Sequence, residues 1–115
     1  IGIQKSTEKA ALQSFNKIKR TSTHIYLDSN INMNANVKYH SFKKGDCNFV
    51  SIAAASIIAK CTRDKIMLKL SKKFSQYGWQ TNVGYGTKEH LLAITKYGIT
   101  KYHRISYQPI KSMYK

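Results

Sequence analysis

A chain of 115 residues has room for one domain with a hydrophobic core and excludes a pair of ordinary domains, so residues 1–115 are expected to form a single domain. Twenty lysines and arginines against five aspartates and glutamates give a net charge of +15, and 42% of the residues are hydrophobic. This composition excludes a disordered tail. The charge indicates a polyanionic partner, for which nucleic acid is the best candidate.

No membrane anchor is expected in this sequence. Its longest apolar stretch, residues 52–59, is far shorter than the roughly 20 residues that a bilayer span requires. The opening IGIQKSTEK does not resemble a signal peptide, and the absence of an initiator Met leads us to expect a fragment or a processed product. Cys47 and Cys61 match neither a CxxC motif nor a zinc-binding spacing, so reduced thiols in a cytoplasmic protein are expected.

The first part of the chain is expected to contain one helix and two strands. Apolar residues recur at intervals of three and four within residues 4–19, which predicts an amphipathic helix. A polar turn over residues 20–23 leads to residues 24–28, HIYLD, whose aromatic and β-branched side chains predict a short strand. Alternation within residues 37–42 predicts a second strand, which the segment KKGD ends.

Residues 49–74 have a helical pattern, and the helix is expected to form two pieces. Asp64 is expected either to pair with a neighbouring basic residue or to mark the junction between them. The first piece, VSIAAASIIAK, carries small and apolar residues on most faces. It is therefore expected to be packed on all sides.

The last part of the chain is expected to hold one further helix. A loop is predicted over residues 77–86, and Thr87 is the predicted N-cap of a helix that runs to Tyr97 and stops at Gly98. Irregular structure is expected over residues 99–115.

Two of the five acidic residues are candidates for metal binding. Asp28 ends the first predicted strand, at the kind of edge where α/β folds place ligands, and Asp46 follows Gly45 18 residues later (46 minus 28). Two carboxylates brought together repel unless a cation lies between them, and Mg²⁺ or Mn²⁺ accepts both carboxylate and phosphate oxygens. The alternative is an Asx turn from Asp28 to Asn30, with Asp46 capping the following helix.

The segment Gly84-Tyr85-Gly86-Thr87 is a candidate contact with nucleic acid. Flanking glycines expose the tyrosine and let the backbone approach a ligand closely, and the helix start at Thr87 favours an anion. An exposed ring at this place suits stacking on a base or a sugar. The alternative is a tight turn in which Tyr85 is buried in the core.

The histidines offer no catalytic set. His24, His40, His90 and His103 show no short paired spacing, so packed or exposed imidazoles are expected. His103 precedes Arg104 and is a candidate phosphate contact.

Several segments, taken in order, resemble the ribonuclease HII family. They are YLDSN (residues 26–30), KKGDCNFVSIAAASIIAKCTRDKIM (43–67), GYGTKEHLLAITKYGIT (84–100) and YHRISYQPIK (102–111). The opening IGIQKSTEKAAL also fits the family. This set keeps its order and its separations, and it is much more specific than any single motif in it.

The resemblance implies an α/β chain with part of an RNase H-like fold. It also implies endonucleolytic cleavage of the RNA strand in RNA/DNA hybrids, and at ribonucleotides embedded in DNA, by a two-metal mechanism. Asp28 and Asp46 resemble the third and fourth of the family's four carboxylates, so both are expected to be catalytic ligands of Mg²⁺ or Mn²⁺. Tyr85 is expected to stack on the sugar beside the RNA–DNA junction, where the ribose 2′-OH distinguishes RNA from DNA. Further nucleic-acid contacts are expected from Gly84, Gly86, Thr87, Lys43, Lys44, Lys60, Arg63 and Arg104.

One departure from the family pattern is large. The first two carboxylates of the family lie in an Asp-Glu-x-Gly-Arg-Gly motif, and no Asp-Glu dipeptide occurs in this sequence. We therefore expect a C-terminal portion that is catalytic only with the missing N-terminal part, and a monomeric full-length parent. The alternatives are a non-catalytic basic nucleic-acid-binding fragment and a ribosomal or structural protein. The last of these explains the charge but not the ordered motifs.

Overall fold

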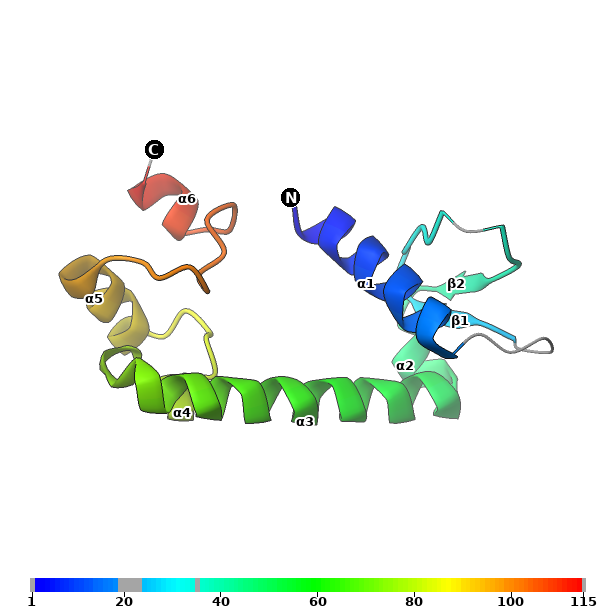
Figure 1. Ribbon diagram of the computed structural model, residues 1–115, viewed down its shortest axis with the longest axis horizontal. Coiled ribbons are helices and arrows are strands. Elements are labelled where there is room, and N and C mark those ends of the chain that lie inside the picture. The colour runs from blue at the N-terminus through cyan, green and yellow to red at the C-terminus, as the bar shows by residue number, and fades with distance from the viewer. Residues whose placement is uncertain (1, 19–23, 35, 115) are drawn as a thin grey trace. The chain divides into compact units, whose positions relative to one another are not determined.

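The computed structural model describes residues 2–18, 24–34 and 36–114 and is mainly helical, with one small parallel sheet (Figure 1). The chain divides into two compact units, an N-terminal unit of Ile1–Ser56 and a C-terminal unit of Ile57–Lys115. The turn expected over residues 20–23 lies outside the described residues. Within those residues, no helix has both the length and the apolar character needed to cross a bilayer.

The N-terminal unit begins with α1 (Ile3–Ile18), which confirms the predicted first helix. Ala11, Leu12 and Phe15 are half-buried on one side of this helix, whereas Ile18 is exposed. The apolar stripe predicted from the sequence therefore contacts the rest of the unit over only part of its length.

The sheet of the N-terminal unit consists of β1 (Tyr26–Asp28) and β2 (His40–Phe42), which lie side by side in Figure 1. They pair in parallel, with Tyr26 opposite His40 and Asp28 opposite Phe42. Both strands are shorter than the predicted 24–28 and 37–42. Phe49 packs against them, since its ring centroid lies 4.4 Å from that of Phe42 and 5.7 Å from that of Tyr26. These aromatic contacts hold the sheet against the segment that follows it.

A short helix, α2 (Gly45–Asn48), connects the sheet to the long helix α3 (Val50–Lys73). The prediction of two helical pieces is wrong, because α3 is continuous and Asp64 lies exposed in its middle. The sequence from Val50 to Lys73 contains neither glycine nor proline. Nothing in it therefore interrupts the backbone hydrogen bonds.

The expectation that VSIAAASIIAK is packed on all sides is also wrong. Val50 is 88% exposed, Ile57 63% and Ile58 67%, whereas Ile52 is buried. The sheet of the described residues has two strands, which is too small a surface to cover an apolar helix all round.

The C-terminal unit contains short helices where a loop and an irregular tail were expected. The 3₁₀ helix η1 (Ser75–Tyr77) and α4 (Trp79–Asn82) occupy part of the expected loop, and α6 (Ile110–Met113) lies in the expected irregular tail. The predicted helix from Thr87 is confirmed as α5 (Lys88–Tyr97). The Thr87 side chain accepts a hydrogen bond of 3.3 Å from the His90 N–H, and Gly98 ends the helix.

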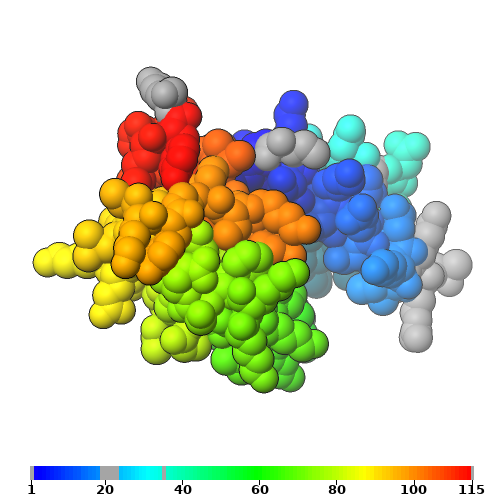
Figure 2. Space-filling view, turned by 60° about the vertical axis from the view of Figure 1, so that its left-hand side comes forward, coloured from blue at the N-terminus to red at the C-terminus, as the bar shows by residue number. Residues whose placement is uncertain are grey.

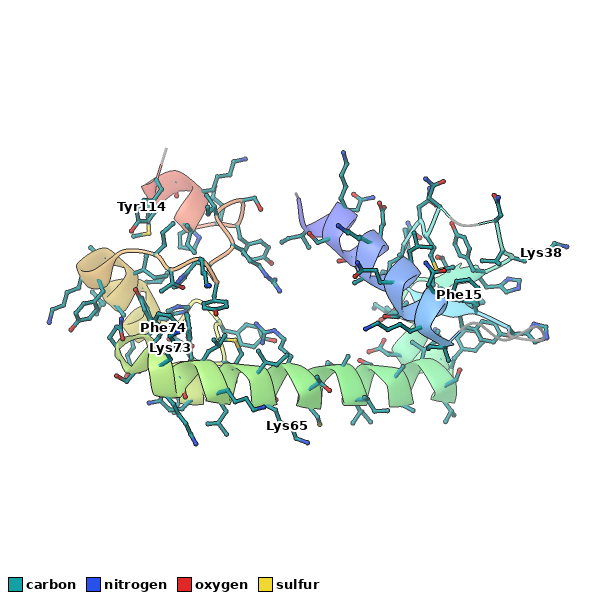
Figure 3. All side chains as sticks on the ribbon, viewed as in Figure 1. Phe15, Lys38, Lys65, Lys73, Phe74 and Tyr114 are labelled. Carbon is teal, nitrogen blue, oxygen red and sulfur yellow. The ribbon has the colours of Figure 1, made fainter. Side chains whose placement is uncertain are left out.

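The core of the C-terminal unit is formed by buried residues from η1, α4, α5 and α6, namely Tyr77, Trp79, Ala93, Ile94 and Ile110. Phe74 points into this core and Lys65 of α3 points away from it (Figure 3). The segment after α5, orange in Figure 2, packs over the end of α3, where the ring centroids of Phe74 and Tyr102 lie 5.7 Å apart.

Candidate active site

Asp28 is the last residue of β1, and its half-buried carboxylate contacts the start of α2. Its Oδ1 accepts a hydrogen bond of 2.9 Å from the backbone N–H of Gly45, 17 residues away in the chain. A Cβ at position 45 would lie 2.7 Å from Cδ1 of Ile52 and 3.5 Å from Oδ1 of Asp28. Glycine therefore allows the carboxylate and the helix to approach closely. This contact joins residues 17 positions apart, which a local turn from Asp28 to Asn30 would not by itself produce.

Asp46 is half-buried in the first turn of α2, directly after the N–H group that holds Asp28. The N-cap of α2 is Lys44, whose φ of 53° is left-handed and whose side chain makes no capping hydrogen bond. The alternative in which Asp46 caps the helix is therefore wrong. The structure brings the Asp28 carboxylate to the residue next to Asp46.

An open cavity of about 410 Å³ lies at the end of β1. It is lined by Asp28, Ser29, Asn30, Ile31 and three residues of α1, namely Gln4, Thr7 and Glu8. The side-chain amide of Gln4 donates to Oε1 of Glu8 at 3.2 Å. Sequence reasoning missed Glu8 as a neighbour of this site, because its place on a helix surface gives no sign that the end of β1 lies beside it.

The type of donor at this site fits a divalent cation, and the number of donors falls short. Carboxylate oxygens are the ligands that Mg²⁺ and Mn²⁺ prefer. Asp28 lines the cavity, whereas Asp46, which follows the Gly45 that binds Asp28, is not among its lining residues. Within residues 2–18, 24–34 and 36–114, however, no group of three or more His, Cys, Asp or Glu side chains is arranged to hold a metal ion. Among the described residues, the two aspartates are therefore carboxylates close in the fold without a complete set of metal ligands.

Tyr85 lies in the loop before α5, and its side chain is 67% exposed. The alternative in which Tyr85 is a core residue is therefore wrong. The guanidinium carbon of Arg63 lies 5.5 Å from the centre of its ring, a distance that suits a cation–π contact. The backbone of Tyr85 is held on both sides: its N–H donates to the Asn82 carbonyl at 2.8 Å, and its carbonyl accepts from the Thr87 N–H at 2.9 Å.

Gly84 and Gly86 flank Tyr85, and their surroundings differ. Gly84 has a φ of 86°, and a Cβ there would lie 3.2 Å from Cε of Met67, so the backbone itself requires glycine. A Cβ at Gly86 would meet nothing within 4 Å. Gly86 therefore leaves open space next to an exposed ring.

Two of the expected phosphate contacts lie together in the C-terminal unit. Arg63 and Arg104 both line a cavity of about 320 Å³ whose wall also includes Gly84, Tyr85, Gly86, His90 and His103. Lys60 is exposed on α3 and is not among the residues that line this cavity. Lys43 and Lys44 are exposed in the N-terminal unit, just before α2.

The same cavity contains a histidine pair that the sequence did not reveal. The Nε2 atoms of His90 and His103 lie 3.3 Å apart, although 13 residues separate them in the chain. Trp79 donates its indole N–H to Nε2 of His90 at 3.1 Å. Burial, together with the nearby His90, lowers the pKa of His103 from its ordinary value of 6.5.

One protein family matches the chain over most of its length. The family model described as ribonuclease HII matches residues 3–110. The chain belongs to the ribonuclease HII family. A ribonuclease HII from Staphylococcus epidermidis is 46% identical over 115 residues, which is all of this chain and 44% of that protein. A ribonuclease HII from Pelagibacter ubique is 59% identical over 78 residues, which is 68% of this chain and 42% of that protein.

The resemblance to ribonuclease HII expected from the sequence is thereby confirmed, and the matched residues include both aspartates and the Tyr85 loop. The chain spans less than half the length of either ribonuclease HII it was compared with. The Asp-Glu-x-Gly-Arg-Gly motif expected in ribonuclease HII is absent from the sequence.

Proposed function

We propose that this chain supplies two of the metal-binding carboxylates of a ribonuclease HII, Asp28 and Asp46. The whole protein would cleave the RNA strand of RNA/DNA hybrids and ribonucleotides embedded in DNA. The observation that carries this proposal is the 2.9 Å hydrogen bond that holds the Asp28 carboxylate at Gly45, the residue before Asp46. In an RNase H-like fold, β1 and β2 would form part of a larger central sheet.

Bound Mg²⁺ or Mn²⁺ would supply Lewis acidity for phosphodiester hydrolysis. Asp28 and Asp46 would hold the ion, and the Gly45 N–H would orient the Asp28 carboxylate as an outer hydrogen bond commonly orients a metal ligand. Two carboxylates do not complete the coordination of such an ion. We infer that further carboxylates come from a segment with the Asp-Glu-x-Gly-Arg-Gly motif.

The C-terminal unit would recognise the substrate. Tyr85 combines a fixed backbone with an exposed ring, which suits stacking on the sugar beside an RNA–DNA junction. Arg63 and Arg104 would contact phosphates near it, because a guanidinium group can donate two parallel hydrogen bonds to one phosphate. Gly86 would let the nucleic acid approach the backbone, and the α5 start at Thr87 would favour a phosphate. Lys60 remains a predicted phosphate contact on α3.

In the N-terminal unit, Lys43 and Lys44 would attract the scissile strand toward the two aspartates. A cytoplasmic location also remains a prediction. It fits the free thiols of Cys47 and Cys61, because disulfides are rare in that compartment.

A cleavage assay tests the catalytic assignment. The protein would join this chain to a segment with the Asp-Glu-x-Gly-Arg-Gly motif, and the substrates would be an RNA/DNA hybrid and a DNA duplex with a single ribonucleotide. Asp28→Asn and Asp46→Asn are each expected to lower kcat by about 100-fold or more, since even outer-sphere changes at metal sites cost about 10–100-fold. Asp64→Asn is the matched control, because Asp64 is an exposed aspartate in the middle of α3. Undiminished cleavage by Asp28→Asn would overturn the assignment.

A second candidate function is non-catalytic binding of nucleic acid. The net charge of +15 favours it. It predicts binding that weakens steeply with salt, without cleavage even after the motif-bearing segment has been joined. The same assay therefore separates the two candidates.

A further inference from the structure

His90 is 4% exposed, and its hydrogen-bond partners determine which ring nitrogen carries the proton. Its Nδ1 lies 2.8 Å from the carbonyl oxygen of Tyr85, which only accepts hydrogen bonds, so Nδ1 must donate. Its Nε2 receives the indole N–H of Trp79 at 3.1 Å, and an indole N–H only donates. The His90 ring is therefore neutral, with its proton on Nδ1.

In His103 the ring proton is on the other nitrogen. Its Nδ1 accepts the Thr100 backbone N–H at 2.9 Å, so the proton of the neutral ring is on Nε2. That proton faces Nε2 of His90, 3.3 Å away. His103 and Trp79 thus both direct an N–H at the single lone pair of Nε2 of His90, Trp79 from the shorter distance of 3.1 Å against 3.3 Å. Either N–H keeps the His90 proton on the side of Tyr85.

We propose that His90 is the positioning residue for Tyr85, and that Trp79 and His103 set the tautomer with which it holds the Tyr85 carbonyl. This inference rests on the proposed stacking of Tyr85 on a ribose. The hydrogen bond from Nδ1 of His90 to the Tyr85 carbonyl, called the clamp below, holds the backbone of Tyr85 and leaves its ring free for a ligand. Because the carbonyl also accepts the Thr87 N–H at 2.9 Å, the loop is fixed from two directions at the residue whose ring is exposed.

The surroundings of the clamp support a role beyond core packing. A core histidine needs partners, but these partners need not lie at an exposed aromatic residue. Here one ring nitrogen contacts the backbone of the exposed Tyr85, and the other belongs to a network that includes the buried Trp79. The network therefore joins the core to the backbone of the residue that carries the solvent-facing ring.

The first test is the tautomer, measured on the 115-residue chain by ¹⁵N–¹H correlation spectra of the imidazole nitrogens near pH 7.5. The proposal predicts a proton on Nδ1 of His90 and on Nε2 of His103. The exposed His24 serves as an internal reference. A proton on Nε2 of His90 would overturn the clamp.

The second test replaces His90 with Asn or with Gln, whose side-chain amides take the places of different ring nitrogens. In His90→Asn the side-chain NH₂ takes the place of Nδ1 and keeps the donor to the Tyr85 carbonyl. In His90→Gln the amide reaches the place of Nε2 and keeps a partner for Trp79 while losing the clamp. The measured quantity is the junction preference, defined as the ratio of affinities for a DNA duplex with one ribonucleotide and for the same duplex without it. The binding protein is the joined protein of the cleavage assay.

His90→Gln is expected to lower the junction preference by about tenfold, a loss comparable to that of one stacking contact. His90→Asn should retain it within about threefold. In a Tyr85→Ala background, His90→Gln should cause no further loss, because it acts through Tyr85. Equal losses in the Asn and Gln variants, or a His90→Gln loss that persists in the Tyr85→Ala background, would contradict positioning.

The outcomes also separate this inference from the proposed function. An unchanged junction preference in Tyr85→Ala overturns the stacking role, and the positioning role falls with it even if the tautomers are as expected. A Tyr85→Ala loss combined with a proton on Nε2 of His90 leaves the stacking role intact and overturns the clamp alone.

Discussion

The backbone N–H of Gly45 donates a hydrogen bond of 2.9 Å to Oδ1 of Asp28, which joins the end of β1 to the start of α2. The residue after Gly45 is Asp46, so one short helix start holds one carboxylate and carries the other. The position of the two aspartates therefore depends on the absence of a side chain at residue 45.

We predict that Gly45→Ala destabilises the chain. The new Cβ would lie 2.7 Å from Cδ1 of the buried Ile52, and overpacking of this kind costs about 1–3 kcal/mol. The free energy of unfolding, measured with urea, should fall, and Ile52→Val in the same chain should restore part of it by removing Cδ1. Gly86→Ala is the control, since its Cβ meets nothing within 4 Å. A Gly45→Ala chain as stable as the Gly86→Ala chain would contradict this packing.

The N-cap of α5 gives a second prediction. Thr87→Ala should lower the free energy of unfolding by about 1 kcal/mol, because the His90 N–H loses the side-chain acceptor it has at 3.3 Å. Thr87→Ser keeps the hydroxyl and should remain close to the original stability. Thermal unfolding followed by circular dichroism compares the two variants, and equal melting temperatures would exclude the cap.

Stability is predicted to depend on pH through His103. Burial, with His90 nearby, lowers the pKa of His103 below 6.5 in the folded chain, so the unfolded chain binds more protons once the pH falls below 6.5. The contribution of this group to stability is therefore complete above pH 6.5 and decreases toward the lowered pKa as the solution becomes more acidic. Urea unfolding between pH 7.5 and pH 5 should show this decrease.

His103→Gln should flatten that pH dependence, because the titrating group is removed. His24→Gln should leave it unchanged, since His24 is exposed. If the His103→Gln chain loses stability with falling pH as steeply as the original, another group is responsible.

Salt dependence tests the basic residues beside the aspartates. Each phosphate neutralised on a DNA duplex contributes about 0.9 to the slope of log affinity against log salt. Lys43→Ala or Lys44→Ala should therefore reduce the slope by about one unit. Lys65 points away from the core on α3 (Figure 3) and is not a proposed contact, so Lys65→Ala should leave the slope unchanged. Equal effects of all three substitutions would indicate a diffuse positive surface without a defined track.

Local signals in the sequence were sufficient to predict part of the fold. The α1 helix, the Thr87 cap and the Gly98 stop each depend on residues within a few positions of one another, and all three are confirmed. The ordered motifs around Asp28 and Asp46 also identified the family correctly.

The remaining features depend on contacts between distant parts of the chain. The segment of α3 from Val50 was expected to be buried, and it is largely exposed. The apolar composition of a helix shows that it can be buried, but it does not show whether the fold supplies a surface large enough to cover it. The hydrogen bonds of His90 to Trp79 and His103 join residues 11 and 13 positions apart. Trp79 lies in α4, His90 in α5 and His103 after α5, so only the fold reveals the network.

The most direct test of the shared-metal assignment is a titration of the ¹⁵N-labelled chain with Mn²⁺, whose unpaired electrons broaden nearby amide signals. The signals of Asp28, Gly45 and Asp46 are predicted to broaden together at the lowest Mn²⁺ concentrations, and Asp28→Asn should remove this effect while Asp64→Asn preserves it. Broadening that leaves these three residues unaffected, or that is unchanged in Asp28→Asn, would contradict a divalent-cation site shared by the two aspartates.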